Sequence, residues 1–260
     1  MSWDERQRAM LAEMGFRLPV RAAAVIEAEA DDVEVAVVER PAAPAPLVAR
    51  PVVAAPAAAP APHLAMPEPA GFAGLDEPAL RAAVAACRAC GLCQQRRHAV
   101  FGNGALQQAQ WLVVTDPPDE SDDASGEALG GDAGRLLDRM LLAAGQRRAG
   151  DAPTAFVTPI VKCRPPRGRA PQPAELDACE AVLARQVELL QPRLVLAMGV
   201  QAARRLTGLA EPLGRLRGRV HRWRGLPVVV TYPPGYLLRT PADKAGAWDD
   251  LRLAMASAST

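Results

Sequence analysis

Four of the five cysteines fall into two pairs whose spacing is suited to metal binding. Cys87 and Cys90 form a Cys-x-x-Cys motif, and Cys163 and Cys179 are separated by 15 residues that begin with Arg-Pro-Pro. Sets of four thiolates bind zinc or an iron–sulfur cluster, and spacing alone does not separate the two. Free cysteines also occur as small buried hydrophobic residues, but two such pairs favour a metal centre. Cys93 is left over.

Charge and hydropathy place limits on where these cysteines act. The 260-residue chain has a formal net charge of +1, so no bulk attraction to nucleic acid or membrane is expected. No apolar run reaches the length of about 18 residues that a membrane span needs. The first ten residues, MSWDERQRAM, lack the apolar core of a signal peptide. We therefore predict a cytoplasmic location, where cysteines are kept reduced, and no membrane partner.

Composition divides the chain into three parts. Residues 1–21 predict a short amphipathic, partner-binding peptide. Residues 22–75 are rich in Ala and Pro, and proline prevents a persistent helix or strand, so a disordered linker is expected there. Residues 76–260 have the pattern of a folded domain. The candidate partner-binding residues of the peptide are Trp3, Met10, Leu11, Met14, Phe16, Val20 and Arg21.

The folded part alternates apolar strands with helices. Strands are expected at 110–115, 154–161, 193–198 and 226–231, and helices at 77–90, 132–144, 173–190, 201–206 and 242–255. Such alternation predicts a three-layer α/β/α sandwich around a four-stranded parallel sheet. Ligands of such sheets bind beyond the carboxyl ends of the strands. The loops after Thr115, Thr158, Met198 and Thr231 are therefore the places to look for a site.

Several motifs, in order and spacing, resemble those of the family 4 uracil-DNA glycosylases. They are CRACGLC at 87–93, VFGNG at 100–104, DAGRLLDRML at 132–141, VKCRPPRGRAPQPAELDAC at 161–179, MGVQAARRLTG at 198–208, RLRG at 215–218, YLLR at 236–239 and WDDL at 248–251. The resemblance implies the uracil-DNA glycosylase fold. It also implies a four-iron, four-sulfur cluster on Cys87, Cys90, Cys163 and Cys179, with zinc as the alternative and Cys93 outside the set.

Members of this family flip uracil out of DNA and cleave its glycosidic bond, yet four of their site positions differ in this chain. The family's Gly-Glu-x-Pro-Gly loop reads Thr-Asp-Pro-Pro-Asp, so Asp116 replaces a Glu. Leu129 replaces the stacking Phe, Pro159 the Asn that reads the uracil edge, and Pro233 the His that stabilises the leaving group. No other histidine replaces it, since His98 and His221 are interpreted as surface residues.

Charged residues give opposing indications about DNA. An acidic run after the first strand, Asp116 to Asp123, is expected to form a negative mouth that repels a phosphate backbone. Basic residues in the family's motifs are candidates for a weak or indirect DNA contact, although a solvated basic face is the alternative. These candidates are Arg164, Arg169, Arg217 and Arg239.

The amino-terminal peptide resembles the start of the psi subunit of bacterial DNA polymerase III. The resemblance rests on Leu11-Ala-Glu-Met14-Gly15-Phe16 followed by Val20-Arg21. It implies clamp-loader subunits and a chi-like subunit as partners. With four altered site positions, the main hypothesis is a non-catalytic, psi-like interaction module in DNA replication. The alternative is an active glycosylase that removes uracil or another deaminated base.

Overall fold

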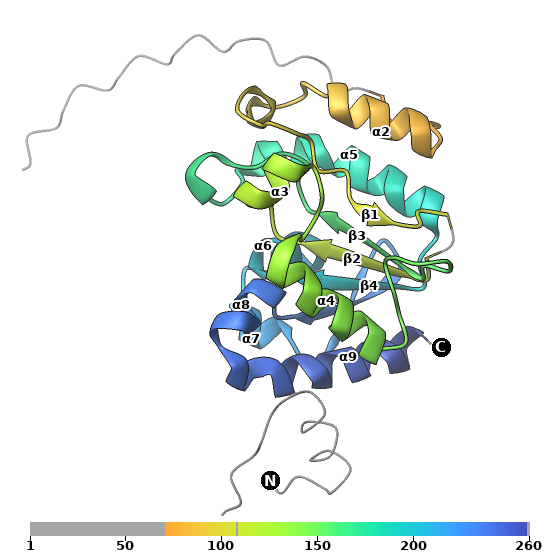
Figure 1. Ribbon diagram of the computed structural model, residues 1–260, viewed down its shortest axis with the longest axis vertical. Helices are drawn as coiled ribbons and strands as arrows, with labels where there is room; N and C mark the ends of the chain where they lie inside the picture. Colours follow the sequence, from red (N-terminus) through yellow and green to blue (C-terminus); the bar gives the residue numbers. More distant parts are fainter. Residues whose placement is uncertain (1–70, 108, 259–260) are drawn as a thin grey trace, which may run out of the picture. The chain divides into compact units, whose positions relative to one another are not determined.

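The computed structural model describes residues 71–107 and 109–258 (Figure 1). The predicted peptide at 1–21 and nearly all of the predicted linker at 22–75 lie outside these residues. Packing begins before residue 76, because the Phe72 side chain is only 1% exposed in the core. Leu75 packs against the same core, and its carbonyl accepts a hydrogen bond of 2.7 Å from Arg185 Nε.

Four parallel strands form the centre of the sheet. They are β2 (Trp111–Thr115), β3 (Ala155–Pro159), β4 (Leu194–Met198) and β6 (Leu226–Thr231). Two short strands, β1 (Asn103–Gly104) and β5 (Val220–Trp223), pair antiparallel at the edges. The strand order is β1-β3-β2-β4-β6-β5.

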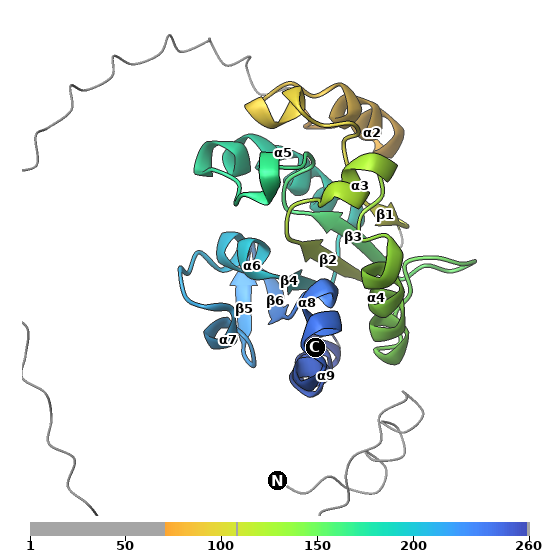
Figure 2. The ribbon, with the colours of Figure 1, turned by 60° about the vertical axis from the view of Figure 1, so that its left-hand side comes forward.

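Helices cover both faces of this sheet (Figure 2). One face carries α5 (Pro173–Leu190) and α6 (Val200–Thr207), with α2 (Glu77–Ala86) packed outside α5. The other face carries α4 (Gly131–Ala143) and α9 (Lys244–Ala258), with α8 (Pro234–Arg239) against α4. The remaining helices are short: α3 (Glu120–Ser125), α7 (Leu213–Leu216) and the 3-10 turns Gly91–Gln94, Pro166–Gly168 and Pro241–Asp243.

Alternation along each strand divides the core into two clusters. In β2, Leu112 and Val114 face the cluster that contains side chains of α2, α5 and α6. Trp111 and Val113 face the cluster that contains side chains of α4 and α9. Because both faces are covered, the parallel strands read as continuous apolar runs. That is why their positions could be predicted so closely from the sequence.

The predicted α/β/α sandwich with four parallel strands is confirmed, and the structure adds two edge strands. β1 is only two residues long, and β5 reads Val-His-Arg-Trp, so neither produces an apolar run. The predicted helix at 77–90 ends at Ala86, where the backbone of Cys87 turns out of helical geometry. Within the described part of the chain, no helix is long and apolar enough to cross a membrane.

A buried ion pair ties the last helix to the loop before β5. Asp250 of α9 is 1% exposed, and its Oδ2 lies 2.6 Å from Nε of Arg217. Burial raises the pKa of Asp250, whereas the arginine opposes this shift by stabilising the carboxylate. Removing one partner from such a pair leaves an uncompensated charge in the interior.

We expect Asp250→Ala to lower the free energy of unfolding by about 3–5 kcal/mol, because the Arg217 guanidinium would stay buried without its partner. Asp249→Ala, at the neighbouring exposed position of the same helix, is the control and should change it by less than about 0.5 kcal/mol. Urea unfolding followed by circular dichroism measures both. Equal effects of the two substitutions would contradict the assignment.

Candidate active site and cysteine pocket

The four parallel strands end in a single row, which places their following loops side by side. Thr115 pairs with Pro159 on one side and with Met198 on the other, and Met198 pairs with Thr231. Backbone bonds continue the alignment one residue further, from Asp116 N to Met198 O (3.1 Å) and from Gly199 N to Thr231 O (3.3 Å). This row is the edge at which α/β sheets bind ligands, and we call it the carboxyl edge.

Asp116 is the carboxylate at the carboxyl edge. Its Oδ1 accepts backbone hydrogen bonds from Gln201 (2.8 Å) and Ala202 (3.0 Å), and its Oδ2 accepts one from Val200 (3.2 Å). The side chain therefore caps the start of α6 from a different strand. Burial raises the pKa of Asp116, while the three N–H donors and the positive end of the helix favour the ionised form.

Gly199 allows the carboxylate of Asp116 to reach the helix. Its φ is +107°, and a Cβ built on it would overlap the Asp116 carboxyl group. A residue with a side chain would therefore both strain the backbone and displace the aspartate.

The other three positions predicted to differ from the family's site have different surroundings. Pro159 is the last residue of β3, directly beside Thr115, and Pro233 follows β6 as the cap of α8. Both therefore lie at the carboxyl edge near Asp116. Leu129 lies in the loop before α4 with φ +52°, packs against the α4 and α9 cluster, and its carbonyl accepts a bond of 3.1 Å from Arg148.

An aromatic stack follows β6 at the carboxyl edge. The rings of Tyr232 and Tyr236 stack with centroids 5.0 Å apart, and the Arg217 guanidinium lies 3.8 Å from the Tyr232 centroid. The buried pair of Arg217 with Asp250 holds the inner end of this stack. The Tyr236 hydroxyl donates to Asp243 (2.5 Å). The edge thus has aromatic side chains that the sequence interpretation did not single out.

The predicted acidic mouth is wrong for much of the run. Asp122 and Asp123 are 6% and 3% exposed, and each accepts a backbone hydrogen bond, from Gly130 (3.3 Å) and Arg97 (3.0 Å) respectively. Asp119 caps α3 through bonds to Ser121 and Asp122. The physical reason is that these carboxylates satisfy backbone donors at turns and helix starts, so they do not form a common negative surface.

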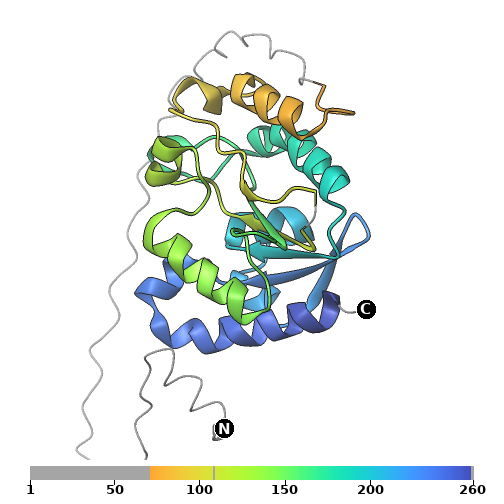
Figure 3. The ribbon, with the colours of Figure 1, turned by 45° about the vertical axis from the view of Figure 1, so that its right-hand side comes forward.

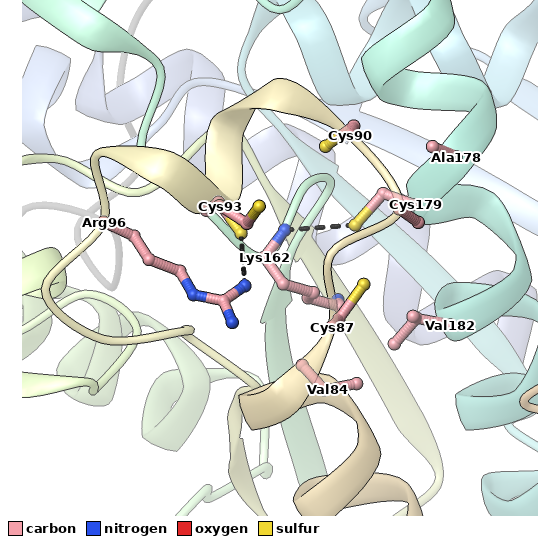
Figure 4. Close-up of a pocket in the computed structure, with 11 residues that line it drawn as sticks. Val84, Cys87, Cys90, Cys93, Arg96, Lys162, Ala178, Cys179 and Val182 are labelled. Carbon is pink, nitrogen blue, oxygen red and sulfur yellow. Dashed lines mark hydrogen bonds between the residues drawn. The ribbon is translucent and has the colours of Figure 1, made fainter. Parts of the chain in front are cut away.

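All five cysteines line one pocket on the outer side of α5 (Figure 4). Cys87, Cys90 and Cys93 come from the turn after α2, Cys163 from the segment after β3, and Cys179 from α5. The structure therefore brings together the four predicted ligands and also Cys93. Within residues 71–107 and 109–258, no three side chains of the His, Cys, Asp or Glu type are placed to hold a single metal ion.

Hydrogen-bond donors point at two of the sulfurs. Arg96 Nη1 lies 3.0 Å from Cys163 Sγ, and the backbone N of Lys162 lies 3.2 Å from Cys179 Sγ (Figure 4). Burial raises the pKa of Cys90 and Cys179, and raises that of Cys163 to about 11. Without a cation these groups stay thiols near neutral pH, and binding of a metal would deprotonate them.

Lys162 is buried beside the cysteines at 2% exposure. Its Nζ donates to Thr158 Oγ1 (2.5 Å) and to the Pro159 carbonyl (2.8 Å). Burial lowers its pKa to about 8. The cysteine pocket and the end of β3 at the carboxyl edge are thus connected through one lysine side chain.

Three of the four arginines predicted as DNA contacts form ion pairs. Arg164 pairs with Glu120 (3.2 Å), Arg169 with Glu175 (2.5 Å) and Arg217 with the buried Asp250. Arg239 is exposed in the last turn of α8. Their contact with DNA stays a prediction.

The two histidines of the folded part make backbone contacts. His98 Nδ1 lies 3.1 Å from the Asp123 carbonyl, and His221 Nε2 lies 2.7 Å from the Leu216 carbonyl. Both belong to loop or edge-strand packing at a distance in sequence from the carboxyl edge.

Comparison with known proteins decides the family. The Uracil DNA glycosylase superfamily matches residues 101–252, which span β1 to α9. The chain belongs to this superfamily. It is 37% identical over 175 residues to the type-4 uracil-DNA glycosylase of Pyrobaculum aerophilum, which covers 64% of this chain and 87% of the relative. The type-4 enzymes of Thermotoga maritima and Archaeoglobus fulgidus are 34% and 32% identical to this chain. Each alignment covers 61% of this chain and 81% of the relative.

These relatives contradict the hypothesis of a non-catalytic, psi-like interaction module. The relatives that match the folded part at 30–37% identity are named as enzymes, type-4 uracil-DNA glycosylases. The error was to equate the loss of particular side chains with the loss of a site. The carboxyl edge keeps a positioned carboxylate, and the stacked tyrosines add contacts that were not considered.

Three groups in these two sites were missed from the sequence. The sequence gives no sign that Arg96 lines the pocket, because an arginine on the surface could follow a cysteine motif equally well. Lys162 does carry a signal, because a lysine that directly follows a buried apolar strand needs hydrogen-bond acceptors or a counter-charge in the interior. Tyr232 directly follows β6, and an aromatic residue at the carboxyl end of a parallel strand is the signal that could have identified it.

We expect Gly199→Ala to destabilise the domain more than Gly208→Ala. Gly208 also has a positive φ (+70°), but nothing lies within 4 Å of where a Cβ would stand. The Gly208→Ala substitution therefore reports the cost of backbone strain alone, about 1–2 kcal/mol. Gly199→Ala adds displacement of Asp116 from α6. Thermal unfolding of both variants tests this, and equal losses of stability would contradict the role given to Asp116.

Proposed function

We propose that the folded part of the chain is a DNA glycosylase that removes uracil, or another base produced by deamination, from DNA. The observation that carries the proposal is the similarity to type-4 uracil-DNA glycosylases over 175 residues, together with the superfamily match from β1 into α9. A target base buried in a duplex must be flipped out to be reached. The carboxyl edge is where the flipped nucleotide would bind.

Asp116 is the side chain best placed to act on the glycosidic bond. Cleavage of that bond by water creates positive character on the sugar and negative charge on the departing base. A fixed carboxylate stabilises the first and orients or deprotonates the attacking water. Asp116 Oδ2 accepts only one long backbone bond (3.2 Å), which leaves lone pairs for a water. The three backbone N–H groups that hold the carboxylate only donate hydrogen bonds to it, so they do not take up the proton that it would accept from water.

Pro159 and Pro233 alter how a base would be recognised and how its charge would be stabilised. Neither side chain donates a hydrogen bond, so recognition of the base edge falls to backbone groups at the carboxyl edge and to stacking. The Tyr232–Tyr236 stack supplies an aromatic surface beside this edge, and stacking is tolerant of base identity. This supports activity on more than one deaminated base.

The cysteine pocket supports a four-iron, four-sulfur cluster held by Cys87, Cys90, Cys163 and Cys179. The residues fit such a group, because cysteines from three separate segments line one pocket and N–H donors point at two sulfurs. Zinc–sulfur bonds are about 2.3 Å, so a zinc site gathers its ligands round one point. The resemblance of the motifs at 87–93 and 161–179 to those of the type-4 enzymes favours the cluster over zinc. The cluster would cross-link α2, β3 and α5.

The glycosylase proposal is tested by base release from oligonucleotides that contain one uracil, hypoxanthine or xanthine. The wild-type chain should release uracil, and alkaline cleavage at the abasic site measures the rate. Asp116→Asn should slow release by about 100-fold or more, because it removes the charge while keeping an oxygen for Gln201 and Ala202.

Asp119→Asn is the matched control, since Asp119 also caps a helix but is exposed at α3. It should leave the rate of base release nearly unchanged. Failure of the wild-type chain to release any of the three bases overturns the proposed activity. Unchanged release by Asp116→Asn would leave the activity standing and remove Asp116 from it.

The cluster assignment is tested with two cysteine variants. Purified without oxygen, the wild-type chain should be brown and carry iron and inorganic sulfide. Cys163→Ser should lose most of the iron and lower the thermal midpoint, because the centre joins distant segments. Cys93→Ser, in the same pocket but outside the predicted set, should keep the iron. A colourless protein with one zinc per chain would refute the cluster.

A further inference from the structure

Two cations lie in the cysteine pocket without an acidic partner. Lys162 is 2% exposed, and its Nζ donates hydrogen bonds to a hydroxyl and a carbonyl. Arg96 donates to Cys163 Sγ (3.0 Å) and to the Ala85 carbonyl (2.5 Å). Among the described residues, no carboxylate forms a salt bridge with either one. Most other half-buried arginines of the domain pair with an acid, such as Arg217 with Asp250.

A buried ammonium group without a counter-charge is costly, and native proteins rarely keep one. Both side chains line the same pocket as the five cysteines. Arg96 Nη1 donates to Cys163 Sγ (3.0 Å), and the backbone N of Lys162 donates to Cys179 Sγ (3.2 Å). The counter-charge therefore has to come from the thiolates themselves. As neutral thiols they do not supply it, and as ligands of a metal centre they do.

The charges balance for a four-thiolate centre. An oxidised four-iron, four-sulfur core carries two positive charges and its four thiolates carry four negative ones, so the assembly has two negative charges in excess. Zinc with four thiolates has the same excess. Arg96 and Lys162 supply two positive charges. Arg96 donates to Cys163 Sγ, and Lys162 lines the same pocket next to Cys179 (Figure 4).

We propose that Arg96 and Lys162 are the fixed counter-charges of an anionic thiolate–metal centre, which they retain in the protein and whose reduction potential they raise. This inference rests on the metal centre of the proposed function, and not on base release. Reduction adds a negative charge to the centre, so neighbouring cations favour the reduced form.

The position of Lys162 has a second consequence. Because its Nζ also holds the Pro159 carbonyl, the centre's charge stabilises the end of β3 at the carboxyl edge.

Three substitutions in the full-length holoprotein test the proposal. Arg96→Gln and Lys162→Met each remove one charge at similar side-chain size, and Arg97→Gln removes a neighbouring exposed charge that does not line the pocket. Iron, sulfide and zinc are counted, the loss of metal to an excess of chelator is timed without oxygen, and the reduction midpoint is measured by film voltammetry.

Arg96→Gln and Lys162→Met should each lose metal about tenfold faster than the wild-type chain, and Arg97→Gln should match the wild type within about twofold. At a fixed potential the oxidised-to-reduced ratio should rise about tenfold, a shift of about 59 mV to lower potential for one electron. Arg96→Lys, which keeps the charge, should restore most of the retention. Equal lability of Arg96→Lys and Arg96→Gln would overturn the role of charge.

The outcomes separate this inference from the glycosylase proposal. Wild-type rates of metal loss in both Arg96→Gln and Lys162→Met, or a wild-type chain with neither iron nor zinc, overturn the counter-charge role. Base release by the same preparations is scored independently. A chain that keeps its metal through these two cations but releases no base refutes only the glycosylase. If Lys162→Met fails to fold, Arg96→Gln still decides, because its side chain is partly exposed.

Discussion

The common register of β3, β2, β4 and β6 is the constraint on which both sites depend. Thr115 is aligned with Pro159 and Met198, and Met198 with Thr231, so four loops far apart in sequence begin in one row. The sheet that carries them lies between two layers of helices (Figure 3). Register is strongly specified here because both faces of the sheet are buried, and a slip of one residue would exchange the two core clusters. The carboxyl edge is therefore a consequence of core packing rather than of any site residue.

Within that frame, we propose two roles for Asp116 that use different features of one side chain. Its oxygens accept the backbone N–H groups at the start of α6, which joins the loop after β2 to the helix after β4. The same bonds hold a carboxylate at the edge where a flipped nucleotide would lie. Gly199 makes the approach possible. In the proposed glycosylase, Pro159 and Pro233 would leave recognition of a base to backbone groups and aromatic stacking.

The cysteine pocket lies on the α5 side of the same strand, and Lys162 connects the two regions. The lysine follows β3, reaches back to the Pro159 carbonyl, and lines the same pocket as the cysteines. Arg96 approaches the pocket from the turn that carries Cys93. A metal centre here would thus do more than cross-link α2, β3 and α5, since it would also neutralise the buried Lys162 and the partly exposed Arg96.

The residues alone were enough for the elements that are buried on both sides. The apolar runs at 110–115, 193–198 and 226–231 and the Pro-started helix at 173–190 are local patterns, and the Cys-x-x-Cys with the later cysteine pair indicated a common pocket. β1 and β5 escaped because edge strands are short and half exposed, and their pairing depends on a neighbour far along the chain. The acidic run was misjudged because the destination of each carboxylate, a backbone donor in a turn or helix, is a tertiary fact. The same holds for Asp116 at the start of α6, for the Arg217–Tyr232–Tyr236 stack, and for Lys162, which forms no salt bridge within the described part of the chain. The local sequence specifies which chemical groups exist, while long-range packing specifies which group each one contacts.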